Sequence, residues 1–455
     1  MQNISDAVMS DYIDKICQDM KESYAIDFSQ HQNYNIKRGL RNSDGTGVIA
    51  GVTSIASVQG YMMLDGEPIP MPGRLYYRGI EISEIVSEHI KNGIFGFEEV
   101  MYLLLVGKLP TREQLEVFDA AQSGARKLPT NFMEDNMLRA HSPDIMNQLA
   151  KNILALYTYD PNPDDTSLKN MLRQSIELMG RVPILVATAY RIKQHYDDGG
   201  SLLLHKPIES LSFAENFLHI IRPDNKYTRE EALLLDVMLT LHAEHGGGNN
   251  STFTSRVLAS TGTDTYGAIS AAVSSLKGPL HGGANKKAME MLDNVRQNVP
   301  EWHDEGKLAD YLRLIRDRKA NDGSGKIYGL GHAVYTMSDP RSLILKDYAK
   351  KMASGTQFEE DFELMDAIER IGIQVLNEKL GKRKAICANV DMYSGIVYEM
   401  LGIPQELYTP LFAVSRLAGW CAHRMEEALT GGRIMRPGYR AVMPHNEYVP
   451  MSERG

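Results

Sequence analysis

A histidine stands in a frame of small residues at 276–285, LKGPLHGGAN, where Gly278 and Pro279 precede His281 and two glycines follow it. Proline lacks a backbone donor and glycine lacks a Cβ, so the imidazole has few neighbours in its own segment. Apolar residues recur at helical spacing in the next stretch, ANKKAMEMLDNV, so we expect His281 just before or within the first turn of a helix. The positive end of a helix favours a neutral ring that can donate a hydrogen bond to a developing oxyanion. A histidine in an ordinary turn is the alternative.

A second glycine frame surrounds His332 in YGLGHAVYTMSDPR. Gly329 and Gly331 would bring backbone groups close to a ligand, and an ordinary loop is the alternative. Further on, Asp339 and the proline after it have the order of an N-cap and a first helical residue. Arg341 would then lie in the first turn, where a cation opposes the helix dipole. A residue placed against local preference indicates function, and a bidentate clamp on a carboxylate fits an arginine.

Two further candidates each have a structural alternative. Asp391 precedes an apolar helix in ANVDMYSGIVYEML, which suits either a general base or a helix cap. Arg416 lies in a segment that we expect to be a helix capped by Thr409 and Pro410, with aromatic residues four positions before and after it. Those neighbours indicate a partly desolvated guanidinium, or one whose stem covers apolar surface at an interface.

The segment TREEALLLDVMLTLHAEHGGGN predicts a helix that begins with a capping box of Thr228 and Glu231. His245 continues its apolar face, and we expect the glycines at 246–248 to end the helix. A histidine in that position is usually a satisfied core residue. His242 and His245 could also bind zinc, although HxxH without the glutamate of HExxH is a weak signal.

The remaining elements indicate a mainly α fold. Residues 47–79 alternate β-branched residues with Asp-Gly and Pro-Gly turns, which predicts small hairpins, and helices dominate from Phe97 onward. Ser142 and Pro143 have the order of an N-cap and a first helical residue. The small residues of 265–278 would let one helix approach another closely, in a tight core or in a subunit contact.

Composition excludes several classes of protein. The 455 residues predict two to three domains, and 43% hydrophobic with 24% charged residues is typical of a soluble globular chain. Three widely spaced cysteines form neither a disulfide framework nor a metal pair, which favours the cytoplasm. A net charge of −9 argues against nucleic acid, and no secretory signal, membrane-spanning run or nucleotide-binding loop is found.

Several of these segments together resemble one family. HAEHGGGN, GPLHGGAN, GLGHAVYTMSDPR, ANVDMYSG, VSR and RIMRPGYR occur in the order of the citrate synthase motif series, and GRLYYRGIEI and FEEVMYLLLVGKLPT are similar to its N-terminal half. The match runs from about residue 49 to 443. It implies a two-domain helical fold with a small N-terminal β region and a cleft that closes on substrate. The large domain would be 49–281 and 391–455, the small domain 282–390, and residues 1–48 a separate N-terminal segment.

The resemblance also implies a reaction, in which acetyl-CoA condenses with oxaloacetate and citryl-CoA is hydrolysed to citrate and CoA. Asp391 would take a proton from the acetyl methyl group, His281 would donate to the enolate oxygen, and His332 would polarise the ketone. Oxaloacetate would be held by His245, Arg341 and Arg416, and by Arg436 from the partner subunit of a homodimer. CoA would meet Leu330, Gly331, Ala333, Asn389 and Lys326, with the basic stretch 381–384 as a further candidate. No metal or other bound cofactor is implied.

Two departures and three rivals remain. Thr336 stands where many members have arginine or lysine, and Ala388 replaces the usual proline before NVD. The first departure bears on one CoA phosphate contact and the second on the rigidity of the loop that carries Asp391. A 2-methylcitrate synthase using propionyl-CoA shares these motifs, and one methylene contributes only about 1–3 kcal/mol of discrimination. A metal-dependent hydrolase that uses His242 and His245 is the second rival, and a non-catalytic helical dimer is the third.

Overall fold

The computed structural model describes residues 11, 13–17, 20, 26–43, 46–64, 67–380, 386–443 and 445–454. The chain forms two compact units, residues 1–52 and 53–455. The first contains the short helices η1 (Phe28–Tyr34) and η2 (Arg38–Leu40). All predicted site residues belong to the second unit. The division of that unit into a large and a small domain stays a prediction.

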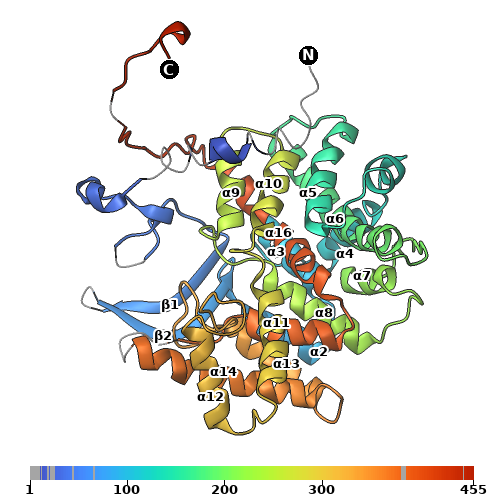
Figure 1. Ribbon diagram of the computed structural model, residues 1–455. Coiled ribbons are helices and arrows are strands. Elements are labelled where there is room, and N and C mark those ends of the chain that lie inside the picture. Colours follow the sequence, from blue (N-terminus) through green and yellow to red (C-terminus); the bar gives the residue numbers. More distant parts are fainter. Residues whose placement is uncertain are drawn as a thin grey trace. The chain divides into compact units, whose positions relative to one another are not determined.

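The predicted β region is confirmed. β1 (Ala56–Leu64) and β2 (Glu67–Tyr77) form an antiparallel hairpin, and β3 (Ile80–Glu81) pairs with the end of β2 (Figure 1). The Asp-Gly pair lies at 65–66, outside the described residues, whereas the Pro-Gly pair lies inside β2 and forms no turn. A Cβ at Gly73 would come within 2.1 Å of the carbonyl oxygen of Ser338. This glycine therefore lets β2 press against the segment that carries His332.

Helices form most of the rest of this unit, as expected for a mainly α fold. They are α2 (Ile82–Asn92), α3 (Phe97–Val106), α4 (Arg112–Gly124), η3 (Met133–Leu138), α5 (Ile145–Leu156), η4 (Tyr157–Tyr159), α6 (Leu168–Tyr196), α7 (Phe213–Ile221), α8 (Arg229–His242), α9 (Asn250–Ala259), α10 (Thr265–Lys277), α11 (Ala284–Asn298), α12 (Glu305–Arg316), α13 (Pro340–Ala353), α14 (Glu359–Leu380), α15 (Asp391–Met400), η6 (Gln405–Leu407), α16 (Tyr408–Leu429) and η7 (Met451–Glu453). None of them, in the described part of the chain, combines the length and apolarity that crossing a bilayer requires.

Helix α16 lies among α3, α6, α8, α9 and α10 (Figure 1). It is buried almost all round, from Leu411 to Met425, so a helix of the core and not of the surface carries Arg416. The small residues of α10 serve a tight core, because Ala268 and Ala272 are fully buried and the helix packs on α5 and α9. A subunit contact at α10 stays a prediction.

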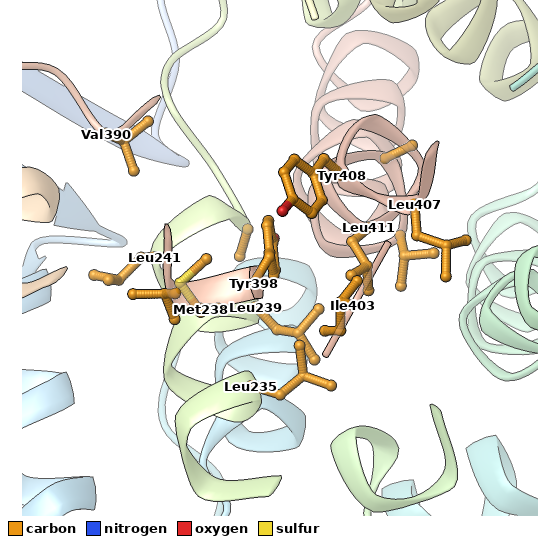
Figure 2. Close-up of a cluster of buried hydrophobic side chains, with 14 of the residues drawn as sticks. Leu235, Met238, Leu239, Leu241, Val390, Tyr398, Ile403, Leu407, Tyr408 and Leu411 are labelled. Atoms are coloured by element: carbon orange, nitrogen blue, oxygen red, sulfur yellow. The ribbon is translucent and has the colours of Figure 1, made fainter. Parts of the chain in front are cut away.

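One hydrophobic cluster holds the end of α8 in place. Figure 2 shows Leu235, Met238 and Leu239 of α8 facing Tyr398 of α15 and the start of α16. All three side chains from α8 are buried, and each fully buried apolar side chain contributes about 1.5–3 kcal/mol. The cluster therefore anchors the segments from which His245, Asp391 and Arg416 project.

Several helix ends differ from expectation. The capping box of Thr228 and Glu231 is present, but α8 ends at His242, before the glycines. Asp144, not Ser142, caps α5 by accepting from the backbone of Asn147, because its carboxylate lies directly before the first turn.

The predicted cap of α16 is wrong as well. Leu407 occupies the N-cap position and makes no side-chain cap bond, while Thr409 and Pro410 lie inside the first turn. Thr409 donates its hydroxyl instead to the carbonyl oxygen of Gly282 at 2.9 Å. A contact with a segment far away in sequence has taken the hydroxyl that a local cap would have used.

Candidate active site

His332 lies in a loop that fixes its tautomer. Its Nδ1 accepts hydrogen bonds from the backbone N–H groups of Val334 and Tyr335, both at 3.0 Å. Burial, assisted by the charge of Arg341, lowers the pKa of His332 to about 4. The ring is therefore neutral at physiological pH, and its proton resides on Nε2, which can donate to an acceptor.

His245 follows the end of α8 and meets His332 edge to face, with ring centroids 5.0 Å apart. Its Nε2 is buried and has no hydrogen-bond partner among the described residues. Burial and the charge of Arg341 lower the pKa of His245 well below its ordinary value. A buried polar atom without a partner is costly, so this nitrogen is available to a ligand.

His281 has the opposite tautomer. Its Nε2 accepts the backbone N–H of Ser251 at 3.2 Å and lies 3.0 Å from that residue's hydroxyl, which Trp420 Nε1 also contacts at 3.2 Å. Burial, assisted by Arg416, lowers the pKa of His281 to about 4. A neutral ring whose Nε2 accepts must carry its proton on Nδ1. The prediction that His281 lies just before a helix is confirmed, since α11 begins at Ala284.

The glycine after His281 has a packing reason that the sequence did not show. A Cβ at Gly282 would lie 2.2 Å from the carbonyl oxygen of Leu276 and 2.9 Å from the methyl group of Thr409. Glycine is therefore required here by the close approach of α10 and α16, besides leaving space around the imidazole.

Arg341 is buried and paired with the cap of its own helix. Asp339 accepts from the backbone N–H of Arg341 at 3.0 Å, from its Nε at 3.1 Å and from its Nη2 at 2.8 Å. Only 3% of Arg341 and 1% of Asp339 are exposed. Burial opposes the charge, but Asp339 raises the pKa of Arg341 above its ordinary value. The predicted N-cap is confirmed, and it explains how a cation is tolerated in the first turn.

Arg416 is buried without such a partner. Its Nε donates to the carbonyl oxygen of His242 at 2.7 Å, and its guanidinium lies 4.6 Å from the centre of the Phe412 ring. Its Nη2 is buried and has no hydrogen-bond partner in the described part of the chain. Burial lowers the pKa of Arg416 to about 10 although the charge of Glu244 opposes this change. A desolvated guanidinium with an open donor is suited to a carboxylate ligand.

Asp391 begins α15 and is fixed by its backbone. Asn389 accepts the N–H of Asp391 at 2.9 Å and donates its side-chain amide to the carbonyl oxygen of Gly331 at 2.8 Å. An antiparallel bridge between Leu330 and Ala388 ties the same two segments together. Burial raises the pKa of Asp391 to about 6, while Arg341 opposes the rise. A carboxylate with such a pKa is ionised at pH 7 and basic enough to accept a proton.

The two arginines act on a common set of groups. Arg341 lowers the pKa of both His245 and His332, whereas Arg416 lowers that of His245 and His281. Both oppose the rise in the pKa of Asp391. Because charges act strongly only over short distances in a protein, these side chains surround one site. These predicted residues therefore lie within electrostatic reach of Arg341 or Arg416.

Arg436 lies in the tail that follows α16. Its side chain is exposed, and residues 432–442 contain neither helix nor strand, in agreement with the predicted extended tail. The neighbouring Met435 N–H donates to the hydroxyl of Ser260 at 3.1 Å, which places the tail beside the end of α9. In the described part of the chain, no contact joins Arg436 to the residues of the site.

The predicted CoA residues include a glycine with open space at its Cβ position, whose carbonyl oxygen accepts from Asn389. Gly331 has a φ of +92°, and no atom lies within 4 Å of the position of an added Cβ. Leu330 packs against Gly372, whereas Ala333 and Lys326 are exposed. The hydroxyl of Thr336 is buried without a hydrogen-bond partner among the described residues. The basic stretch predicted at 381–384 lies outside those residues.

Sequence reasoning missed four contributors to the site: Asp339 as an ion-pair partner, Ser251, Tyr335 and Glu244. Only Asp339 had a local signal, in the order Asp-Pro-Arg. The zinc alternative gains no support from His242, whose Nδ1 lies 2.7 Å from the carbonyl oxygen of Met238 within α8. No group of three or more histidine, cysteine or acidic side chains in the described part of the chain is arranged to hold a metal ion.

Comparison of the sequence and of the structure with known proteins points to one family. Residues 43–438 match the family described as citrate synthase, C-terminal domain. A citrate synthase of Synechocystis is 35% identical over 84% of this chain and 88% of its own length. A citrate/2-methylcitrate synthase of Bacillus subtilis is 33% identical, over 86% and 93%. The structure of a ternary complex of the Thermoplasma acidophilum citrate synthase with carboxymethyl coenzyme A and oxaloacetate superposes with a TM-score of 0.76 at 28% identity, covering 92% and 99%.

Proposed function

Because this chain belongs to the citrate synthase family, we propose that it condenses acetyl-CoA with oxaloacetate and hydrolyses the product to citrate and CoA. The enzyme is thus an acyltransferase. One observation carries the proposal. His281 and His332 are neutral imidazoles held in opposite tautomers, and Asp391 is a carboxylate whose pKa is raised to about 6. Together these groups supply two uncharged donors and one base, as an enolate condensation requires.

The first step forms the nucleophile. The carboxylate of Asp391 removes a proton from the methyl carbon of acetyl-CoA, and the electron pair moves onto the thioester oxygen. The Nδ1–H of His281 donates a hydrogen bond to that oxygen as its negative charge grows. A neutral imidazole can serve as this donor. The N–H proton of a neutral ring is much less acidic than that of an imidazolium, so its acidity is closer to that of the enol.

The second step forms the carbon–carbon bond. The enolate carbon attacks the ketone carbon of oxaloacetate, and the Nε2–H of His332 donates a hydrogen bond to the ketone oxygen, which becomes an alkoxide. The alkoxide takes the Nε2 proton of His332 and becomes a hydroxyl, and the proton that Asp391 removed from acetyl-CoA restores the neutral ring. Water subsequently attacks the thioester of citryl-CoA, and CoA leaves as a thiol. Arg341, Arg416 and the free nitrogen of His245 would hold the carboxylates of oxaloacetate throughout.

We further propose that the enzyme is a homodimer in which Arg436 of each chain completes the site of the other. The exposed tail that carries this arginine supports the proposal, because an extended, exposed segment can reach a neighbouring chain. The proposal also includes CoA contacts at Leu330, Gly331, Ala333, Asn389 and Lys326, a cytoplasmic location and a reaction without bound metal.

The test is release of CoA thiol by the purified protein from acetyl-CoA, with and without oxaloacetate. Release that requires oxaloacetate and survives a chelator is expected. Loss of activity on chelation and its return with zinc would instead support the metal-dependent hydrolase. Propionyl-CoA must be assayed in parallel, because the Bacillus relative is named for both citrate and 2-methylcitrate. The ratio of the two kcat/KM values decides between these substrates.

A further inference from the structure

Glu244 is a buried carboxylate beside the site that the proposed chemistry does not use. It is 0% exposed and lies in the turn between α8 and α9, next to His245. Its Oε1 accepts the backbone N–H of Gly246 and lies 2.9 Å from His423 Nε2. Its Oε2 has no hydrogen-bond partner in the described part of the chain. One oxygen of this carboxylate is therefore used in structural hydrogen bonds, and the other is not.

The uncommitted oxygen faces the helix that carries Arg416. Arg416, Gly419 and His423 are spaced by three and four residues, so they share one face of α16. A Cβ at Gly419 would lie 2.0 Å from Glu244 Oε2, so glycine is needed for the carboxylate to sit there. Since Arg416 Nε binds the carbonyl of His242, the guanidinium and this carboxylate meet the same short segment of chain.

Glu244 is an anion in the folded protein. Burial opposes its charge, but the neighbouring His423 and, after it, Arg416 lower the pKa of Glu244 below its ordinary value. His423 contacts Oε1 at 2.9 Å, whereas Oε2 stays open beside Gly419 on the face of α16 that carries Arg416. The charge of Glu244 therefore acts on Arg416 as well.

The two arginines of the site thus differ in how their charge is balanced. Arg341 has a direct two-point partner in Asp339. Arg416 has a buried open donor, and the largest influence that favours its charge is that of Glu244. A buried charge without compensation is strongly destabilising, so the empty site needs this anion.

We propose that Glu244 is the resident counter-charge of Arg416, which it balances in the empty site and for which it competes with a carboxylate of oxaloacetate. The proposal rests on the proposed function, because it takes oxaloacetate as the ligand of Arg416. Glu244 is then a positioning residue. It stabilises the ligand-free protein, and it weakens the binding of oxaloacetate. It also keeps citrate, a tricarboxylate, from binding too tightly to leave.

The substitution Glu244→Gln tests this role, because the amide oxygen still accepts from Gly246 and His423 while the charge is lost. By calorimetry, the Kd of oxaloacetate should fall about tenfold, equivalent to about 1.4 kcal/mol. KM for oxaloacetate should fall with it, whereas kcat should stay level or decline as citrate leaves more slowly. The ligand-free protein should melt earlier, and saturating oxaloacetate should raise its Tm by more than it raises that of the wild type.

Two variants serve as controls. Glu244→Asp keeps the charge and should bind oxaloacetate about as the wild type does. Asp160→Asn removes another buried carboxylate, one paired with Arg173 at 2.7 Å outside the site. That change should lower stability and leave the Kd of oxaloacetate unchanged. A purely structural role for Glu244 would make the glutamine variant resemble the Asp160 variant.

Every outcome decides the proposal. An unchanged or higher Kd in Glu244→Gln would overturn it. If that variant is unfolded alone, oxaloacetate should restore a cooperative transition, and failure to do so would also overturn it. Failure of the proposed function is separate, because it would appear in the wild type as an absence of oxaloacetate binding and of CoA release.

Discussion

The backbone N–H of Asp391 donates to the side-chain oxygen of Asn389 at 2.9 Å, so the start of α15 is held by the amide and not by the carboxylate of Asp391. The N-cap position of α15 is Val390, which makes no side-chain cap bond. The carboxylate is therefore free for proton transfer, and its loss should affect chemistry more than folding.

The first prediction follows for Asp391→Asn. We expect kcat to fall by about two to four orders of magnitude, because proton transfer belongs to the chemical step. Binding of oxaloacetate, measured by calorimetry, should remain nearly unchanged. A variant with normal kcat and an early melting transition would show that Asp391 serves the helix and not the reaction.

The second prediction concerns pH. Since the pKa of Asp391 is raised to about 6, kcat/KM for acetyl-CoA should fall as pH drops through about 6, where the base becomes protonated. His281 and His332 stay neutral over this range, because burial lowers the pKa of each to about 4. The residual activity of Asp391→Asn should lack this acid limb. An identical limb in that variant would assign it to another group.

The third prediction applies the same pKa to stability. Folding raises the pKa of this carboxyl from 3.8 to about 6. The ionised carboxylate therefore lowers the free energy of unfolding fully above pH 6, and this destabilisation disappears as the pH falls below 3.8. Asp391→Asn should therefore have a higher Tm than the wild type at pH 8, with a smaller difference as the pH falls toward 4. A Tm difference that does not vary with pH would mean that the carboxyl has an ordinary pKa.

The fourth prediction compares two glycines with positive φ and open space at the Cβ position. Gly331 has φ +92° and lies among the proposed CoA contacts, whereas Gly402 has φ +64° and follows α15. Alanine at either position should destabilise the protein by roughly 1–2 kcal/mol through backbone strain. Only Gly331→Ala should raise KM for acetyl-CoA, since a methyl group there would meet the ligand. Equal KM values in both variants would remove Gly331 from the CoA site.

The fifth prediction tests a shared site. Arg436→Ala and His281→Ala should each be inactive alone. In an equimolar mixture with free exchange, about half of the dimers contain one chain of each kind and one intact site of two. Activity should recover to about a quarter of the wild-type value. Absence of recovery, with mass spectrometry showing mixed dimers, would exclude Arg436 from the site of the partner.

The amino-acid sequence by itself determined the elements and the types of residue in the site. The helix after His281, the Asp339 cap of α13 and the capping box of α8 were all predictable, because helix ends depend on neighbours within a few residues. The β region at 56–81 followed from local alternation in the same way. Where a local signal and a distant partner competed, as at Thr409, the sequence-based prediction was wrong.

Only the tertiary structure decided which nitrogen of His281 carries the proton and how Arg416 is balanced. The tautomer of His281 depends on Ser251, thirty positions away, and the surroundings of Arg416 depend on Glu244, far earlier in the chain. Hydrogen bonds and charges act over a few ångströms in space. The pattern of apolar residues along the sequence does not indicate which distant groups folding brings within that range. Gly282 and Gly419 show the same limit, because their need for glycine comes from atoms of other helices and turns.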